Sequence, residues 1–241
     1  MAKKNTDETI LDVQEVYTNT ELFIENNKKT LLGILIAIIV LIVGFFVYST
    51  FFKNPALASA NEEAHLAEMY FMMDSLDAAK DGTAAFIGFE EIAEIHAGTA
   101  VGMRANYHLG VINRDNGDFE AALENFKNAD FNSPLLGAMV NGNTGDCLVE
   151  IGMSYEEGAE QDSKLAEALP YFKKAANSSP DEITTQVYFK KAANVCLQLG
   201  RYNEAIKMYD GIMKASTNAK STEYKDAVKM KAMAQAKAAQ Q

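Results

Sequence analysis

The sequence predicts an all-α protein in which a single N-terminal transmembrane helix is followed by a solenoid of helical hairpins. Three observations support this prediction. Residues 31–52 form an uncharged, apolar run. The chain from Ala56 onward is rich in Ala, Glu, Lys, Leu and Met, and it lacks the alternation of Val, Ile and Thr that is typical of strands. One set of residue spacings recurs along this same region.

The apolar run has the length of a membrane-spanning helix. Sixteen of its 22 residues are Leu, Ile, Val or Phe. At about 1.5 Å per residue the helix spans roughly 33 Å, against a hydrocarbon core of about 30 Å. The sixteen apolar side chains contribute roughly −5 to −10 kcal/mol to the free energy of membrane insertion, and this is the upper bound of their contribution. The alternative is a helix buried in a soluble core, and the length of the run disfavours it.

The lysines around the run predict its orientation. Lys28 and Lys29 adjoin its N-terminal end and Lys3 and Lys4 lie further out, whereas only Lys53 is close on the other side. Because Lys and Arg accumulate on the cytoplasmic side of a membrane, we expect a cytoplasmic N-terminus, with the chain after Phe52 on the other side of the membrane.

A cleaved signal peptide is the alternative to a retained anchor, since Ala58-Ser59-Ala60 resembles a cleavage site. The apolar run is longer than the usual 7–15 residues of a signal peptide, and nearly 30 residues precede it. Both features favour a signal anchor that is kept. The small residues Gly33, Ala37 and Gly44 make part of one face of the span smooth enough for another membrane helix to approach.

These features divide the chain into five segments. Lys53-Asn54-Pro55 is expected to end the membrane helix. The segments are a cytoplasmic part at 1–30 with an amphipathic helix over 8–27, the span at 31–52, a linker at 53–60, the repeats at 61–220, and a capping helix with a frayed tail at 221–241.

Charge and cysteine content narrow the possible partners. The net charge is −11, and residues 61–241 contain 27 acidic and 17 basic residues. An acidic surface argues against nucleic acid as a partner. Cys147 and Cys196 lie among apolar residues, so we expect buried free thiols, with a single disulfide as the lesser alternative.

The recurring spacing is that of the 34-residue tetratricopeptide repeat (TPR), in which two helices form a hairpin. Its first copy extends from Met103 to Pro134. The shared features are a Leu-Gly pair, a turn glycine, an aromatic residue, and Ala and Phe four residues apart, followed by Ala and Pro. The copies are Leu109-Gly110, Gly117, Phe119, Ala122, Phe126, Ala129 and Pro134; Ala168, Phe172, Ala175 and Pro180; Gly200, Tyr202, Ala205, Tyr209 and Ile212; and a degenerate Ala85, Phe89 and Ile92.

Packing explains this spacing. Small residues such as Gly110 and Ala122 let the two helices of a hairpin approach closely, and Phe126 fills the groove beside the next repeat. Pro134 and Pro180 are expected to stop the second helix of their repeats. No repeat can bury its apolar face alone, so the repeats must stack.

The second repeat departs from the pattern by about 11 extra residues. Residues 153–164 are expected to form an acidic extended turn. The repeat register places Asn141-Gly142-Asn143 inside a helix, which should be weak or kinked there. Pro170 is expected near the start of the following helix, where proline is tolerated.

No motif for catalysis, cofactor or metal binding is found, and His65, His96 and His108 are isolated from one another. We therefore expect a binding protein that is not an enzyme and needs no cofactor. The first helices of stacked hairpins line a concave face, where Tyr107 between two arginines is the best candidate contact. Each candidate could equally be an ordinary solvated residue. They are Arg104, Tyr107, Arg114, Asp146, Glu150, Lys190, Asn194 and Gln198.

The layout resembles the YfgM family of membrane-anchored, TPR-like proteins of Gram-negative bacteria. The resemblance covers nearly the full length, from Glu25-Asn26-Asn27-Lys28-Lys29 into one span and through the repeats. Asp74-Ser75, Gly88-Phe89 and Gly145-Asp146 are similar to the form found in the Bacteroidota. The resemblance implies an ancillary subunit of the SecYEG translocon, linked to a periplasmic chaperone of the PpiD type and to newly exported proteins. With the orientation given above, it also implies a single-pass protein of the bacterial inner membrane whose C-terminal repeats lie in the periplasm. It supplies no catalytic residues.

Two other functions fit the same architecture. The protein could be a TPR scaffold or assembly subunit of another envelope complex, such as an outer-membrane insertion or secretion machinery. A cytosol-facing import receptor is a weaker alternative, because it requires the opposite orientation.

Overall fold

The computed structural model describes residues 6–178 and 181–241. The chain divides into two compact units, Met1–Ser59 and Ala60–Gln241, which are described separately. Lys3 and Lys4, used above for the orientation, and Pro180, used for the repeat pattern, lie outside the described residues.

The first unit is helical throughout its described part. Helix α1 (Thr6–Tyr48) continues without a break from the predicted cytoplasmic segment into the apolar run. A short π-helical segment, η1 (Ser49–Lys53), then leads into α2 (Asn54–Met72). The expectation that the helix ends at Lys53-Asn54-Pro55 is therefore wrong, because the chain is helical from α1 through η1 into α2. Pro55 lies in α2 directly after η1.

One helical stretch in the described chain, within residues 21–72, is long and apolar enough to cross a membrane. Its large apolar side chains are exposed, Leu41 and Phe46 by more than two-thirds, and none of the stretch's most apolar part is buried. Soluble proteins rarely leave so large an apolar surface in water. Its length and exposure are consistent with the predicted transmembrane helix.

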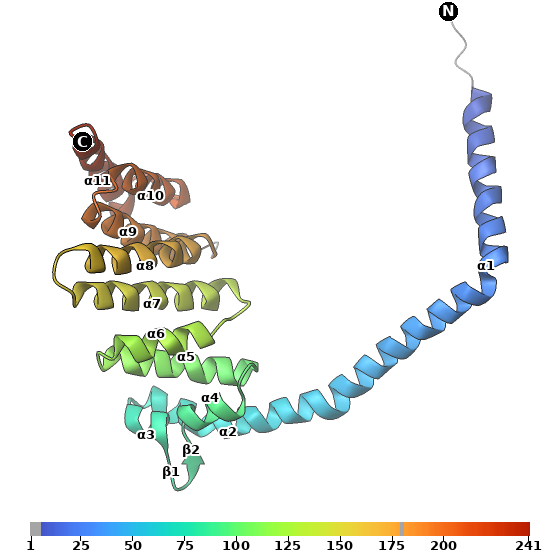
Figure 1. Ribbon diagram of the computed structural model, residues 1–241, viewed down its shortest axis with the longest axis horizontal. Coiled ribbons are helices and arrows are strands. Elements are labelled where there is room, and N and C mark those ends of the chain that lie inside the picture. Colours follow the sequence, from blue (N-terminus) through green and yellow to red (C-terminus); the bar gives the residue numbers. More distant parts are fainter. Residues whose placement is uncertain (1–5, 179–180) are drawn as a thin grey trace, which may run out of the picture. The chain divides into compact units, whose positions relative to one another are not determined.

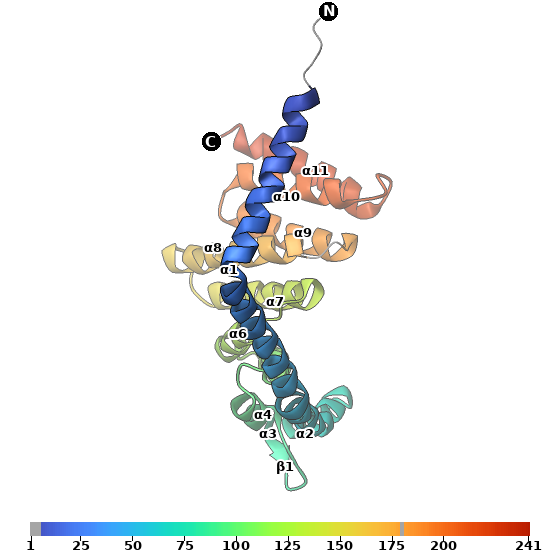
Figure 2. The same ribbon diagram turned by 90° about the vertical axis from the view of Figure 1, so that its right-hand side faces the viewer.

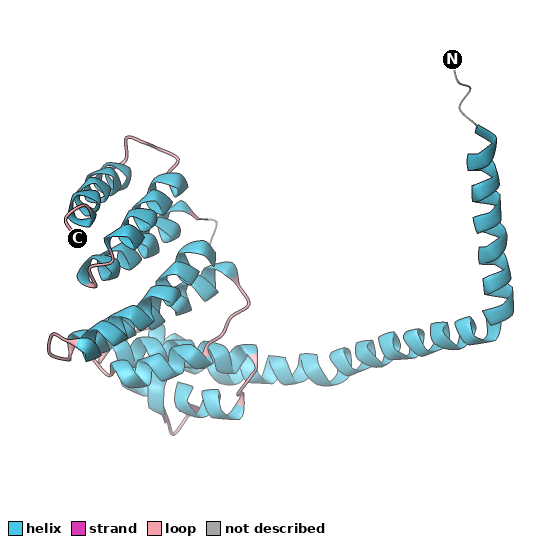
Figure 3. Ribbon diagram, turned by 45° about the horizontal axis from the view of Figure 1, so that its top comes forward, coloured by secondary structure: helices cyan, strands magenta, loops and turns pink. Residues whose placement is uncertain are grey.

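The second unit is a succession of helices joined by short turns (Figure 1, Figure 3). Each helix packs mainly against the helix before it and the helix after it, so α5 to α11 follow one another in sequence order (Figure 2). After α2 come α3 (Leu76–Asp81), β1 (Gly82–Thr83), β2 (Phe86–Ile87), α4 (Phe89–Ile95), α5 (Ala100–Asp115), α6 (Phe119–Asn128), α7 (Pro134–Met153), α8 (Ala159–Ser178), α9 (Glu182–Gln198), α10 (Tyr202–Ala215) and α11 (Thr222–Ala238).

Local sequence explains most of these boundaries. Asp118, Asp181 and Ser221 cap α6, α9 and α11 by accepting hydrogen bonds from free backbone N–H groups of the first turn. Gly117 and Gly200 adopt φ of 82° and 66° in the turns after α5 and α9, a conformation that other residues rarely adopt. The predicted turns at these two glycines are confirmed.

The prediction of helix from Ala56 to the C-terminus is wrong at one place. Residues 82–87 form a small antiparallel hairpin in which Gly82 pairs with Ile87 and Thr83 with Phe86. Ala85 of the degenerate repeat lies in its loop, so the helix of that copy begins at Phe89. The hairpin needs glycine, because a Cβ on Gly88 would lie 2.2 Å from the carbonyl oxygen of Lys80.

The second repeat also differs from its prediction. The turn between α7 and α8 covers only residues 154–158, and most of the extra residues lengthen the two helices instead. Pro170 consequently lies well inside α8 rather than near its start. It sits on the exposed side of the helix, where water can bond the carbonyl group of Ala166 that loses its N–H partner. Pro134 begins α7 instead of stopping α6, which ends at Asn128.

Glycines opposite aromatic rings set the spacing of the helices. A Cβ on Gly110 of α5 would lie 2.7 Å from the ring of Phe126 in α6, and one on Gly145 of α7 would lie equally close to Phe172 in α8. Both rings are almost completely buried. The predicted close approach at Gly110 is confirmed, and the same contact recurs one hairpin later.

The helix that contains Asn141-Gly142-Asn143 is continuous, contrary to the expected weakness. A Cβ on Gly142 would overlap the ring of Tyr188 in α9, so the glycine admits this ring between the helices. Asn141 donates a hydrogen bond to the carbonyl group of Gly137, one turn earlier in α7. Packing against α8 and α9 therefore stabilises a segment that its local sequence alone would not.

Both cysteines are buried and free, as predicted. Cys147 belongs to an apolar cluster with Phe126 and Val140, and Cys196 to a second cluster around Phe172 and Tyr209. Burial raises the pKa of Cys147 to about 12 and that of Cys196 to about 11. Thiols with such high pKa values are poor nucleophiles at neutral pH.

Candidate functional site

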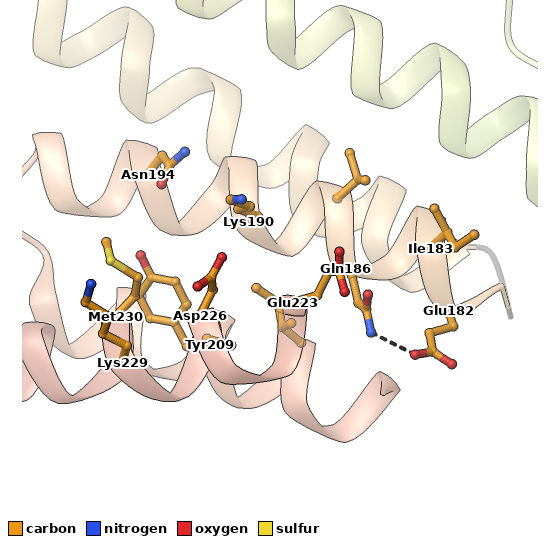
Figure 4. Close-up of a pocket in the computed structure, with 13 residues that line it drawn as sticks. Glu182, Ile183, Gln186, Lys190, Asn194, Tyr209, Glu223, Asp226, Lys229 and Met230 are labelled. Atoms are coloured by element: carbon orange, nitrogen blue, oxygen red, sulfur yellow. Dashed lines mark hydrogen bonds between the residues drawn. The ribbon is translucent and has the colours of Figure 1, made fainter. Parts of the chain in front are cut away.

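A cleft of about 720 Å³ lies between α9 and α11, with α10 beneath it (Figure 4). This volume is within the range of sites that hold small ligands or a few side chains. The lining residues are Glu182, Ile183, Gln186, Val187, Lys190 and Asn194 of α9, Tyr209 and Ile212 of α10, and Glu223, Asp226, Ala227, Lys229 and Met230 of α11.

The floor of the cleft is apolar and tightly packed. Tyr209, Ile212 and Ala227 are each at most 3% exposed. On the rim, Ile183 is 72% exposed and Val187 is 44% exposed. Exposed apolar residues that continue into an apolar floor are typical of a surface that another molecule covers.

The hydroxyl group of Tyr209 is buried and has no hydrogen-bond partner within the described structure. Burial also raises the pKa of this hydroxyl, which therefore stays protonated and can donate a hydrogen bond. A buried polar group without a partner costs about 1–3 kcal/mol. The tyrosine lines the cleft, so a bound molecule could supply the missing partner.

The polar residues of the rim differ in their own contacts. Glu182 accepts hydrogen bonds from Thr217 Oγ1 (2.6 Å) and Gln186 Nε2 (3.0 Å). The bond from Thr217 is the main reason that the pKa of Glu182 is lowered. The side chains of Lys190, Asn194 and Lys229 make no hydrogen bond or ion pair with any described residue.

Side chains bridge α5 to α7 and α7 to α9, but they have no counterpart across the cleft between α9 and α11. Arg114 of α5 donates a hydrogen bond of 2.6 Å to Asn143 of α7. Lys191 of α9 makes an ion pair with Asp146 of α7 at 2.6 Å. In the described part of the chain, no hydrogen bond or ion pair joins the α9 residues that line the cleft to those of α11.

The predicted binding residues are found in four different settings. Arg104 is paired with Glu68 (3.1 Å) and Asn61 (2.8 Å) of α2. Lys190 and Asn194 line the cleft together. Glu150 and Gln198 are exposed but do not line it.

Tyr107, Arg114 and Asp146 belong to a network between helices rather than to an open face. The ring of Tyr107 packs against Phe126 (5.9 Å between centroids) and Phe131 (6.3 Å), so the tyrosine is half-buried. The prediction that Tyr107 is exposed on an open face is therefore wrong. The prediction failed because the sequence pattern could not show which neighbouring helix each side chain contacts.

Two features of the cleft were not predicted from the sequence. They are the buried hydroxyl group of Tyr209 and the α11 residues that line the cleft. Asp226 and Lys229 lie three residues apart, and Met230 follows, so all three face the same side of α11. That spacing is visible in the sequence. Their position opposite Lys190 is not, because it depends on how α10 places α11 against α9.

A second buried polar atom lies far from the cleft. The Nδ1 atom of His108 has no hydrogen-bond partner within the described structure, and its ring stacks on Phe89 (4.7 Å) beside Phe71 (4.5 Å). Burial lowers the pKa of His108, which favours the neutral imidazole.

The predicted membrane-packing residues are exposed along α1. A Cβ on Gly33 or Gly44 would meet no atom within 4 Å, and Ala37 is also exposed. Within residues 6–178 and 181–241, no group of three or more His, Cys, Asp or Glu residues could hold a metal ion. Comparison of the sequence with protein-family models and with curated proteins finds no match.

Proposed function

We propose that this protein is a non-enzymatic, single-pass protein of the bacterial inner membrane whose TPR-like repeats bind polypeptides in the periplasm beside the SecYEG translocon. Its polypeptide partners are translocon subunits, a periplasmic chaperone of the PpiD type, or newly exported chains. The observation that carries this proposal is the α9–α11 cleft, which combines an apolar floor with polar groups that have no partners of their own.

The assignment of TPR-like repeats is supported by agreement between the sequence spacing and the contacts. The Gly110–Phe126 and Gly145–Phe172 contacts occur at equivalent places of two successive hairpins. The pairs Arg114–Asn143 and Asp146–Lys191 link alternate helices, as expected where the first helices of stacked hairpins lie side by side.

The proposed anchor is supported by the length, composition and exposure of the apolar stretch. Lys28 and Lys29 next to it favour a cytoplasmic N-terminus. The association with the translocon rests on the resemblance to the YfgM family together with this orientation.

Co-purification through an N-terminal tag in mild detergent tests the proposal. We expect SecY to co-purify with the full chain, and its absence would contradict the translocon association. Ile38→Lys, Leu41→Lys and Phe45→Lys together should release the complex, because each charge near the centre of a span costs about 2.5–3.5 kcal/mol and three of them offset the free energy that favours insertion. Ala at the same three positions is the matched control and should keep it. Normal co-purification after replacement of the whole span by an unrelated one would show that the soluble part suffices.

A further inference from the structure

The α9–α11 cleft has an acidic end and a basic end. Helices α9 and α11 run in the same direction, because each is joined to α10 by a short turn and runs opposite to it. Glu182 and Glu223 lie at one end of the cleft and Lys229 lies at the other, while Lys190 and Asp226 lie between them (Figure 4). Along each rim the acidic residues come first and a lysine follows, so the charge of both rims changes sign in the same direction.

The helix macrodipole does not explain this arrangement. It favours acidic residues in the first turn of a helix, which accounts for Glu182 and Glu223. Asp226, Lys190 and Lys229 lie beyond the first turns of their helices, where the effect has faded. All three point to the same cleft from opposite walls.

The length of the cleft suits a short extended segment. From Glu182 to Asn194 the lining of α9 rises by roughly 18 Å at 1.5 Å per residue. At about 3.3 Å per residue, an extended chain covers this length with about five or six residues.

The hydrogen-bonding groups of the cleft also suit an extended chain. Such a chain leaves its backbone N–H and C=O groups free, whereas a helix satisfies its own. Asn194 on the rim can both donate and accept, and Tyr209 on the floor offers a buried hydroxyl without a partner. These groups can bind a backbone of any sequence.

We propose that the cleft binds an extended segment of five or six residues in which apolar side chains lie between an acidic residue and a basic residue. The acidic residue lies nearer Lys190 and Lys229, and the basic residue lies nearer Glu182 and Glu223. The apolar side chains cover Ile212 and Val187. This inference rests on the proposed binding of polypeptides and adds the chemistry of the segment that is bound.

The test measures fluorescence anisotropy with the full chain in lipid nanodiscs. The probe is a labelled hexapeptide, capped at both termini, with four apolar residues between Lys and Asp. Two control peptides carry Lys at both ends or Asp at both ends. We expect the mixed peptide to bind about five- to tenfold more tightly than either control, and the difference to shrink at 0.5 M salt because the rim is exposed to solvent.

A charge-reversed variant separates recognition from loss of fold. Lys190→Glu with Lys229→Glu makes both ends of the cleft acidic, so the peptide with two lysines should become the tightest binder. Lys207→Glu with Lys225→Glu makes the same change of net charge outside the cleft and should leave the ranking unaltered. Tyr209→Phe should weaken the mixed peptide about three- to tenfold.

Equal binding of the three peptides, or an unchanged ranking in the Lys190→Glu/Lys229→Glu variant, would overturn this inference. A permanently unfolded, carboxymethylated polypeptide distinguishes that failure from failure of the proposed function. If it binds while the peptides show no charge preference, only the inference falls. If neither it nor any peptide binds, the proposed binding of polypeptides is refuted as well.

Discussion

Substitution of Gly145 by alanine tests whether the contact between glycine and phenylalanine sets the helix spacing. The added Cβ would lie 2.7 Å from the ring of Phe172, whereas carbon atoms in contact are usually about 3.5 Å apart. The ring or the helix must therefore move by about 0.8 Å. Phe172 is 1% exposed and has no open space into which to move.

Two opposing effects determine the size of the change. Overpacking of a core costs about 1–3 kcal/mol, whereas alanine in place of glycine inside a helix gains about 1 kcal/mol. We expect a net loss of about 1 kcal/mol in the free energy of unfolding, which lowers the Tm by about 2–4 °C in a unit of this size. Thermal unfolding of the full chain in mild detergent, followed by circular dichroism, measures it.

Gly152→Ala is the matched control in the same helix. Its Cβ would be 3.2 Å from Cβ of Lys164 and 3.5 Å from Cδ2 of Leu165, so only a small adjustment is needed. This variant should be as stable as the original chain or more stable. Phe172→Leu should reduce the loss caused by Gly145→Ala, as a double-mutant cycle would reveal. Equal Tm values for the two glycine variants would refute the packing argument.

Three further results are expected. Tyr209→Phe should leave the free energy of unfolding unchanged or raise it by about 1–3 kcal/mol, because it removes a buried hydroxyl without a partner; a clear fall in denaturant-induced unfolding experiments would argue against this. Since burial lowers the pKa of His108, the unfolded chain binds more protons near the ordinary pKa of 6.5, and stability should fall as the pH drops from 7.5 to 5.5. His108→Phe should make that fall smaller and His65→Phe, at an exposed site, should not; equal pH profiles for the two variants would contradict the assignment. Cys147 and Cys196 should react with iodoacetamide at pH 8 only after denaturation, as mass spectrometry can show, and rapid labelling of the folded chain would contradict their high pKa values.

Much of the architecture follows from local sequence. The apolar run, the turn glycines Gly117 and Gly200, and the close approach of helices at Gly110 were all predictable, because each depends on composition or on spacing within one hairpin. The errors have other causes. The hairpin at 82–87 depends on close backbone contacts at Gly82 and Gly88, and helix α7 persists through Gly142 because a ring from α9 fills the space beside it.

The candidate site was predictable only in part. The repeat register identified Lys190 and Asn194, which do line the cleft, because their place on α9 follows from helical periodicity. The same register placed Tyr107 on an open surface, where the structure buries half of it against Phe126 and Phe131. Periodicity gives the face of a helix but not the neighbour that covers that face.

The sequence by itself determined that this protein is helical, that one stretch is long and apolar enough to cross a membrane, and that its thiols are buried. These properties depend on composition and on spacings of a few residues along one chain segment. Only the tertiary structure decided that α7 is tied to α5 and α9 while α9 and α11 leave a cleft between them. The physical reason is that a cleft depends on contacts between side chains of helices about 40 residues apart in the sequence. Helical periodicity gives no information about contacts between residues so far apart.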